Sequence, residues 1–185
     1  MRLSRLTTRQ LAAVVCDRLE RHGFTAVLTG GACVMIYARG KYVSQDLDFV
    51  VTPRGPLSRI ETALAELGFR PQGRIYVHPD TDMVVDVGNP WPPAVGQEVL
   101  EVPAPRRVAG HRLRLLPPTD CVKDRLVAFY HWNDRQALEQ AILVCLARKV
   151  DMRGIGRWSR NEGMEPKYRQ FRRELTRRRR ATCRT

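Results

Sequence analysis

The segment LTGGACVMIYARGKYVSQDLDFVV, residues 28–51, contains the pattern that decides the fold. An apolar run ends at the pair Gly30-Gly31, a segment of helical composition follows, and Asp46 and Asp48 then lie inside a second apolar run. Because side chains alternate across a strand, both aspartates point to the same face of the strand predicted for QDLDFVV. Two like charges on one face repel and lose hydration together, so they do not stabilise a core. The pattern therefore predicts a positively charged ligand between the two carboxylates.

A third carboxylate follows in a later apolar segment. GRIYVH and DMVVDVG predict two strands joined by a turn at residues 79–81. Asp86 lies inside the second of these strands and would lie beside the first pair if the strands are neighbours. Asp82 would share its face but is nearer the turn, so we rank Asp86 first. Carboxylates so placed are ligands for Mg²⁺ or Mn²⁺, which complete their coordination with water and substrate phosphates.

The glycine pair predicts a phosphate-binding turn. Gly30 and Gly31 lie between a strand predicted for FTAVLTG and a helix predicted for GGACVMIYARG, where glycine lets backbone amides approach a phosphate and the helix N-terminus adds positive potential. Ser44 offers a hydroxyl, and Arg39 and Lys41 are placed to neutralise phosphates. The alternatives are an ordinary tight turn for the glycines and exposed loop cations for the two basic residues.

These motifs together resemble a known superfamily. A glycine pair, a helix, S-x-D-x-D in a strand and a separate strand aspartate are similar to the signature of the DNA polymerase β-like nucleotidyltransferases. Within them, the chain resembles the minimal bacterial enzymes, especially the AbiEii-type and related nucleotidyltransferase toxins of toxin–antitoxin systems. The resemblance covers residues 8–90, and DCVKDRLVAFYHWNDRQALEQA resembles the helical portion of that group.

The resemblance implies both a fold and a set of roles. The fold is α+β, with a mixed sheet flanked by helices and followed by a C-terminal helical region. Asp46 and Asp48 would ligate Mg²⁺, and Asp86 would complete the site or act as base. The glycine turn and Ser44 would hold the triphosphate of an NTP such as ATP. The commonest motif has Gly-Ser before the helix, so the Gly30-Gly31 pair leaves the serine–phosphate contact open.

Helix- and strand-breaking residues and the charge distribution predict that the chain has three regions. These are a nucleotidyltransferase core at residues 1–116, a helical region at 117–175 and a basic tail at 176–185. Three capping boxes are expected at helix N-termini. Residues 152–158 are expected to form a loop, and two helices are expected to meet near residues 131–134. The three boxes are Thr7 with Gln10, Ser58 with Glu61, and Ser159 with Glu162.

Lys123 is the candidate catalytic residue of the helical region. It lies at i+3 from Asp120 and next to Asp124, so these three residues share one side of a helix. Lys123 could contact the γ-phosphate or the incoming nucleophile. The alternative is a salt-bridged surface set. Trp132 is expected to pack into the core at a helix end rather than to stack on a base.

The net charge of +13 is concentrated near the C-terminus. Residues 1–147 carry 18 Lys and Arg against 15 Asp and Glu, whereas residues 148–185 carry 14 against 4. Clustered arginines are typical of surfaces that bind nucleic-acid phosphates, and the alternatives are a solvated tail or an acidic protein partner. The arginines expected to bind RNA are Arg172, Arg173, Arg177, Arg178, Arg179 and Arg180.

The remaining composition excludes other classes. No apolar run is long enough for a membrane span, and the N-terminus lacks the apolar region of a secretory signal. The five cysteines are scattered without a CxxC pair, which indicates reduced thiols in a cytoplasmic protein.

The leading functional hypothesis is transfer of a nucleoside monophosphate from an NTP to RNA, most naturally a tRNA 3′ end, by a toxin with a cognate antitoxin. A small-molecule acceptor, as for the aminoglycoside nucleotidyltransferases, is less favoured because cationic substrates need an acidic pocket. The motifs are also compatible with a protein acceptor, or with a non-catalytic module on the same fold that binds nucleic acid or a protein partner.

Overall fold

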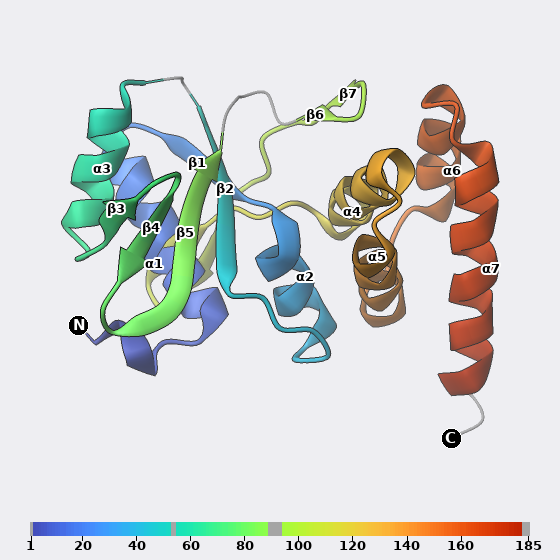
Figure 1. Ribbon diagram of the computed structural model, residues 1–185, viewed down its shortest axis with the longest axis horizontal. Coiled ribbons are helices and arrows are strands. Elements are labelled where there is room, and N and C mark those ends of the chain that lie inside the picture. Colours follow the sequence, from blue (N-terminus) through green and yellow to red (C-terminus); the bar gives the residue numbers. More distant parts are fainter. Residues whose placement is uncertain (1, 53–54, 89–93, 183–185) are drawn as a thin grey trace.

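A five-stranded mixed sheet forms the N-terminal half of the protein (Figure 1). The computed structural model describes residues 2–52, 55–88 and 94–182. The strand order is β1-β2-β5-β4-β3; β2 and β5 are parallel, and the other neighbours are antiparallel. The strands are β1 (Thr25–Leu28), β2 (Asp46–Thr52), β3 (Arg70–Gln72), β4 (Ile75–His78) and β5 (Thr81–Gly88).

Alternation along β2 separates the core from the other face of the sheet. Leu47, Phe49 and Val51 are buried, whereas the residues between them are exposed or half-buried. Val85 of β5 pairs with Leu47 and is buried as well. The strand therefore holds its apolar side chains in the core and carries Asp46 and Asp48 on the opposite face, as the sequence predicts.

Helices α1 (Thr8–Arg21), α2 (Gly30–Ala38) and α3 (Leu57–Ala65) complete this half. In Figure 1, α1 lies behind the sheet and α2 lies between the sheet and the C-terminal helices. The capping box at the start of α1 is confirmed, because the Thr7 hydroxyl accepts from the Gln10 amide and the Gln10 side chain accepts from the Thr7 amide. The box expected at Ser58 is wrong: α3 begins at Leu57 after Pro56, so Ser58 is already inside the first turn.

Four helices form the C-terminal half: α4 (Pro118–Trp132), α5 (Arg135–Ala147), α6 (Met152–Asn161) and α7 (Glu165–Thr182). Helices α6 and α7 lie at the end of the molecule away from the sheet, with α4 and α5 in between (Figure 1). The predicted junction near residues 131–134 is confirmed. Asn133 ends α4 in the left-handed conformation, and the Asp134 carboxylate accepts from the Ala137 amide to cap α5.

Helix α6 corrects two sequence predictions. Residues 152–158 are helical rather than a loop, because Asp151 caps the helix through the Gly154 amide. Ser159 lies buried inside α6, where its hydroxyl donates to the Ile155 carbonyl at 2.8 Å and contacts the Tyr130 hydroxyl. A capping box with Glu162 is therefore wrong. The glycines of this segment concealed a helix that ends at Asn161.

The described part of the basic tail is helical. Helix α7 continues without a break from residue 165 to residue 182, so the described residues show no boundary at 176. Trp132, expected in the core, is 74% exposed because α4 ends there and the chain turns away. Trp158 of α6 is buried instead, stacked on Tyr130, with its indole donating to the Val95 carbonyl at 3.0 Å.

Two short hairpins join the halves. The segment HRLRLL at residues 111–116 carries the one strand pattern in this part of the sequence, and it coincides with β9 (His111–Leu113). The bridge from Leu28 to Leu115 and the bond from the Leu28 amide to the Arg114 carbonyl tie the second hairpin to the edge of β1. The hairpins are β6 (Ala94–Val95) with β7 (Glu98–Val99), and β8 (Arg106–Val108) with β9 (His111–Leu113).

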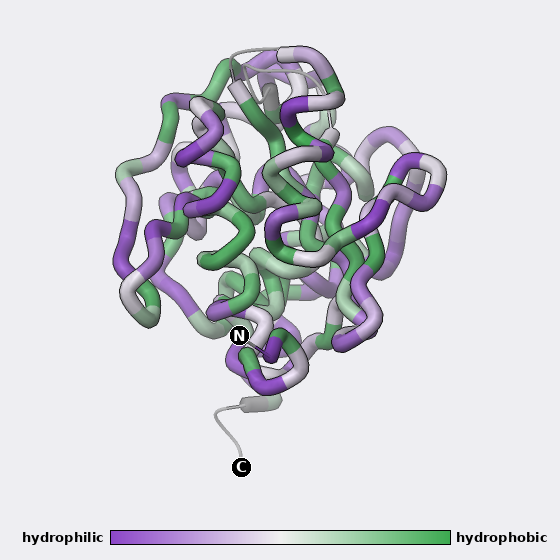
Figure 2. The backbone as a smooth tube through the Cα atoms, turned by 90° about the vertical axis from the view of Figure 1, so that its left-hand side faces the viewer, coloured by the Kyte–Doolittle hydropathy of each residue, from purple (hydrophilic) through white to green (hydrophobic). Residues whose placement is uncertain are grey.

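A single hydrophobic cluster extends through both halves. Hydrophilic segments dominate the outer loops in Figure 2, and apolar segments gather inside. The thiols Cys16, Cys33, Cys121 and Cys145 are free and buried, as predicted, and Cys183 lies outside the described residues. None of the described helices has the length and apolar character that a membrane span requires.

Candidate active site

Strand register brings the predicted carboxylates together. Asp48 of β2 is directly opposite Asp86 of β5, and Asp46 is opposite Val84. Side chains of opposed residues share a face, so Asp46, Asp48 and Asp86 lie on one face of the sheet. Asp46 is exposed, and the other two are half-buried. The neighbouring strands that the prediction for Asp86 required are present.

Asp48 is at the electrostatic centre of this face. Burial, together with the nearby carboxylates of Asp46, Asp86 and Asp124, raises its pKa to about 6 against the opposing effect of the Arg125 guanidinium. Among the described residues, no side chain donates a hydrogen bond to, or forms an ion pair with, the carboxylates of Asp46, Asp48 or Asp86. The site concentrates negative charge that the described protein atoms only partly compensate.

The close approach of the Asp48 side chain requires a glycine at position 30. A Cβ atom at Gly30 would lie 1.8 Å from Asp48 Oδ2, and the residue has a φ of +65°. The turn is fixed to β2 because the Thr29 amide donates to the Asp48 carbonyl at 2.9 Å. Only glycine can start α2 at this point with the carboxylate in place.

Gly31 makes room for Ser44 in the same way. A Cβ atom there would lie 2.8 Å from Ser44 Oγ. The Ser44 hydroxyl donates to the Asp46 carbonyl at 3.3 Å and accepts from the Asp46 amide at 3.4 Å, so it fixes the entry into β2. The structure thus brings the glycine pair, Ser44 and the aspartates into one cluster.

Arg125 is a site residue that the sequence pattern did not reveal. Its guanidinium lies close enough to Asp48 to affect the pKa of that carboxyl group, and Nη2 pairs with Asp124 Oδ2 at 2.6 Å. Arg125 is four residues after Cys121 and four before Phe129, both buried in α4. A charged residue on the buried stripe of a helix is a signal that could have identified it.

In the part of the chain that the structure describes, Lys123 forms its ion pairs with residues other than the three aspartates. It is 6% exposed, and its Nζ contacts Glu98 Oε2 at 2.6 Å and Asp120 Oδ1 at 3.8 Å. Lys123 is thus ion-paired, but it is buried rather than part of a surface set, and Asp124 pairs with Arg125 instead. The contact with Glu98 joins α4 to β7. Arg39, which ends α2 with a φ of 52°, and Lys41 are exposed in the loop that leads to β2.

The donor set suits a hard divalent cation. Aspartate oxygens are preferred ligands of Mg²⁺, and a cation beside Asp48 would stabilise the charged carboxylate that burial and the neighbouring carboxylates disfavour. Within residues 2–52, 55–88 and 94–182, no group of three or more His, Cys, Asp or Glu side chains is arranged to hold a metal ion by itself. The residues fit an ion that keeps water and substrate phosphates as its other ligands.

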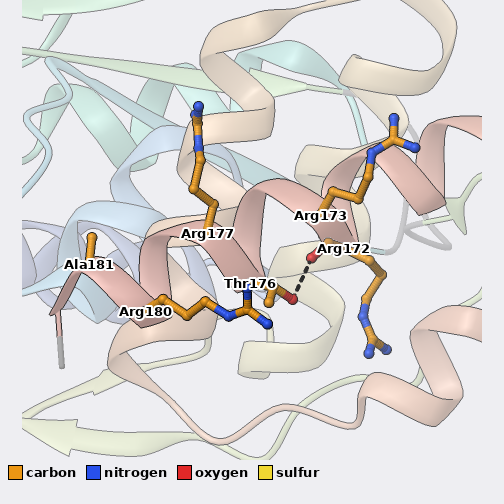
Figure 3. A pocket seen from close by; sticks show the side chains of 6 residues that line it. All are labelled: Arg172, Arg173, Thr176, Arg177, Arg180 and Ala181. Atoms are coloured by element: carbon orange, nitrogen blue, oxygen red, sulfur yellow. Dashed lines mark hydrogen bonds between the residues drawn. The ribbon is translucent and has the colours of Figure 1, made fainter. Parts of the chain in front are cut away.

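The predicted RNA-binding arginines divide between two faces of α7. Arg178 pairs with Glu139 of α5 at 2.7 Å, and Arg179 donates to the Cys145 carbonyl. The other four spread outward around a hollow of about 610 Å³ (Figure 3). This hollow is lined by Arg172, Arg173, Thr176, Arg177, Arg180 and Ala181.

No protein-family model and no curated protein matches the chain. Among solved structures, it is similar to the antibiotic-resistance factor ANT(2'')-Ia, known from a solution structure, with a TM-score of 0.50 and 15% sequence identity. The alignment covers 95% of this chain and 100% of that one, so it includes both the sheet and the C-terminal helices. At 15% identity this likeness shows the fold, and it does not test the resemblance to the AbiEii-type toxins. The predicted fold is confirmed: this chain has a polymerase β-like nucleotidyltransferase fold.

Proposed function

We propose that the protein is an enzyme that transfers a nucleoside monophosphate from an NTP to an acceptor hydroxyl. The observation that carries this proposal is the placement of Asp46, Asp48 and Asp86 on one face of β2 and β5, directly beside the Gly30 turn. A structural role does not account for three neighbouring carboxylates that repel one another.

In the proposed reaction, the acceptor oxygen forms a bond to the α-phosphorus while the bond from that phosphorus to the bridging oxygen breaks and pyrophosphate leaves. The first turn of α2 and the guanidinium of Arg125 bind the phosphates, and Asp86 accepts the proton of the acceptor hydroxyl. Asp46 and Asp48 would hold Mg²⁺, which, when bound, polarises the phosphate and stabilises the leaving oxygen. Mn²⁺ has the same ligand preference and would substitute.

RNA is the acceptor that the charge distribution favours. Helices α6 and α7 carry eleven Lys and Arg and only two acidic residues, Glu165 and Glu174. Four arginines on the open side of α7 surround a hollow that the rest of the described chain leaves accessible. Such a surface binds phosphates through charge, and a tRNA would present its 3′ hydroxyl to the carboxylates.

A small-molecule acceptor is the second candidate. It is favoured by the likeness to the antibiotic-resistance factor ANT(2'')-Ia, which covers 95% of this chain and 100% of that one. The net charge of +13 opposes a cationic acceptor, and we therefore rank it below RNA.

The cellular role that we propose is that of a cytoplasmic toxin controlled by an antitoxin, because modification of tRNA ends stops translation. Expression of the wild-type protein should arrest growth, whereas Asp48→Asn should not. Growth arrest by both proteins would contradict a role that depends on catalysis.

The reaction is tested with NTPs labelled at the α-phosphate or the γ-phosphate, Mg²⁺, and total tRNA, aminoglycosides or the protein alone as acceptor. We expect α-label, but no γ-label, on tRNA. Label on an aminoglycoside or on the protein would replace the RNA proposal while keeping the transfer reaction. No α-label on any acceptor would leave the non-catalytic binding module as the better account.

A further inference from the structure

A second cluster of arginines lies away from the carboxylates, around a cavity of about 250 Å³. Arg9 comes from the first turn of α1, Arg106 begins β8, and Arg148 caps the C-terminus of α5. Three segments far apart in the sequence thus place three guanidinium groups around one space. The cavity is at the C-terminal end of α2, where Ile36 and Tyr37 line it, whereas the aspartates lie at its N-terminal end.

These cations lack acidic partners. Among the described residues, no Asp or Glu forms an ion pair with Arg9, Arg106 or Arg148, and none lines the cavity. Three like charges around a small space repel one another, so an anion between them would be strongly favoured.

Arg148 is also incompletely satisfied. Its Nε is buried and has no hydrogen-bond partner among the described residues. The guanidinium carbon lies 5.7 Å from the centre of the Tyr37 ring, which holds the group in position. A buried donor without an acceptor is costly, and it is rare in native structures unless a ligand or water satisfies it.

Arg9 lies in the first turn of α1, at the positive end of the helix dipole. A cation in the first turn of a helix is opposed by the helix dipole, so its position is unfavourable without a nearby anion. The ring of Tyr37 and the side chains of Leu113, Leu115 and Pro118 give the cavity an apolar wall. The cavity therefore offers concentrated positive charge at the arginines and an apolar surface beside them.

We infer that this cavity binds the phosphate group of a small organic phosphate, with the apolar wall against the rest of the molecule. Three arginines match a dianionic phosphate better than a monoanionic carboxylate, and the guanidinium fork fits phosphate oxygens. The site is separate from the proposed transfer reaction and does not depend on it.

The test uses the full-length protein in EDTA, which removes metal-dependent binding at the aspartates. Inorganic phosphate and AMP are titrated against the wild type at constant ionic strength, with acetate as the carboxylate comparison. We expect phosphate and AMP to bind and to raise the melting temperature, and acetate to have little effect. The double variant Arg9→Gln/Arg106→Gln should weaken phosphate binding by about tenfold or more. Both side chains are exposed, so this variant should still fold.

The matched control is Arg5→Gln/Arg107→Gln. It removes the same charge from neighbouring positions that do not line the cavity, and Arg107 donates to the Gly110 carbonyl instead. Binding should be unchanged in this variant. An equal loss in both double variants, or no phosphate binding by the wild type, would overturn the proposal. A 5′-phosphorylated RNA tetranucleotide distinguishes the source of the phosphate: tighter binding of AMP identifies a small molecule, whereas tighter binding of the RNA would overturn the small-molecule assignment.

Discussion

The position of the Asp48 carboxylate requires glycine at position 30. The carboxylate occupies the space that any other side chain at position 30 would need. We predict that Gly30→Ala displaces Asp48 and lowers the rate of nucleotide transfer by about a hundredfold or more. Gly40→Ala is the control, because Gly40 also has a positive φ, +81°, but its added Cβ would meet nothing within 4 Å. Both variants should lose stability through backbone strain, measured by urea unfolding, and only Gly30→Ala should lose activity. Comparable activity in the two variants would contradict the role of the close contact.

Asp17 is the residue that links stability to pH. It is 6% exposed and accepts from Arg112 Nε at 3.0 Å and from Arg21 Nε at 3.1 Å. Burial opposes ionisation most strongly, but the hydrogen bonds from Arg112 and His111 and the charge of Arg21 outweigh it and lower the pKa from 3.8 to about 2. Because the folded-state pKa is depressed, the stabilisation is present above about pH 4 and is lost as the pH falls towards 2.

We therefore predict that Asp17→Asn lowers the free energy of unfolding at pH 7 by about 2 kcal/mol. The difference from wild type should shrink as the pH approaches 2. Urea unfolding at several pH values measures it, with the exposed turn residue Asp80→Asn as control. A difference that persists undiminished at pH 2 would show that Asp17 acts through packing rather than charge.

Among single helices, the structure and the sequence pattern differ in which residues cap the N-terminus. Asp134 caps α5 through the Ala137 amide at 3.0 Å, whereas Ser58, which the sequence pattern marks as a cap, lies inside α3. We predict that Asp134→Ala destabilises the protein by about 1 kcal/mol and that Ser58→Ala changes stability by less than about 0.5 kcal/mol. Thermal unfolding of the two variants checks this. A larger loss for Ser58→Ala would mean that Ser58 caps α3 and that the helix begins two residues later, at Arg59.

The sheet and most helices were predictable because their patterns are local. Alternation in QDLDFVV and helical spacing after Thr7 are decided by residues a few positions apart. Helix α6 was not predictable in this way, since Gly154 and Gly156 disfavour a helix locally and burial of Ile155 and Trp158 compensates.

Some residues of the candidate site were also predictable from local sequence patterns, whereas the contacts of others depend on the tertiary fold. Asp46, Asp48 and Asp86 were identifiable because charge within an apolar strand is itself a signal. Lys123 pairs with Glu98 of β7, and Arg125 lies near Asp48 of β2, so both depend on the position of α4 in the fold, which no local pattern contains.

Across the whole molecule, the arginines of α7 are separated from the carboxylates of the candidate active site. The carboxylates lie on the sheet, and the open arginine face of α7 lies beyond α4 and α5 (Figure 1). We predict that Arg177→Ala/Arg180→Ala weakens RNA binding and makes the slope of log K against log salt shallower by about 1.4, as expected for two lost contacts to single-stranded phosphates. Arg178→Ala is the control, because Arg178 already pairs with Glu139. Equal slopes in the double variant and the wild type would remove this face of α7 from RNA binding.

We propose that the aspartate face of β2 and β5 carries out metal-dependent nucleotide transfer. The most direct measurement compares transfer of the α-phosphate label by the wild type, Asp48→Asn and Asp82→Asn over a range of Mg²⁺ concentrations. Asp82 is on the same strand as Asp86 and four residues from it, but is exposed near the turn. We predict that Asp48→Asn loses about a hundredfold or more of the rate at every Mg²⁺ concentration, while Asp82→Asn keeps the wild-type rate. Equal rates for Asp48→Asn and the wild type would show that Asp48 has no role in the transfer reaction.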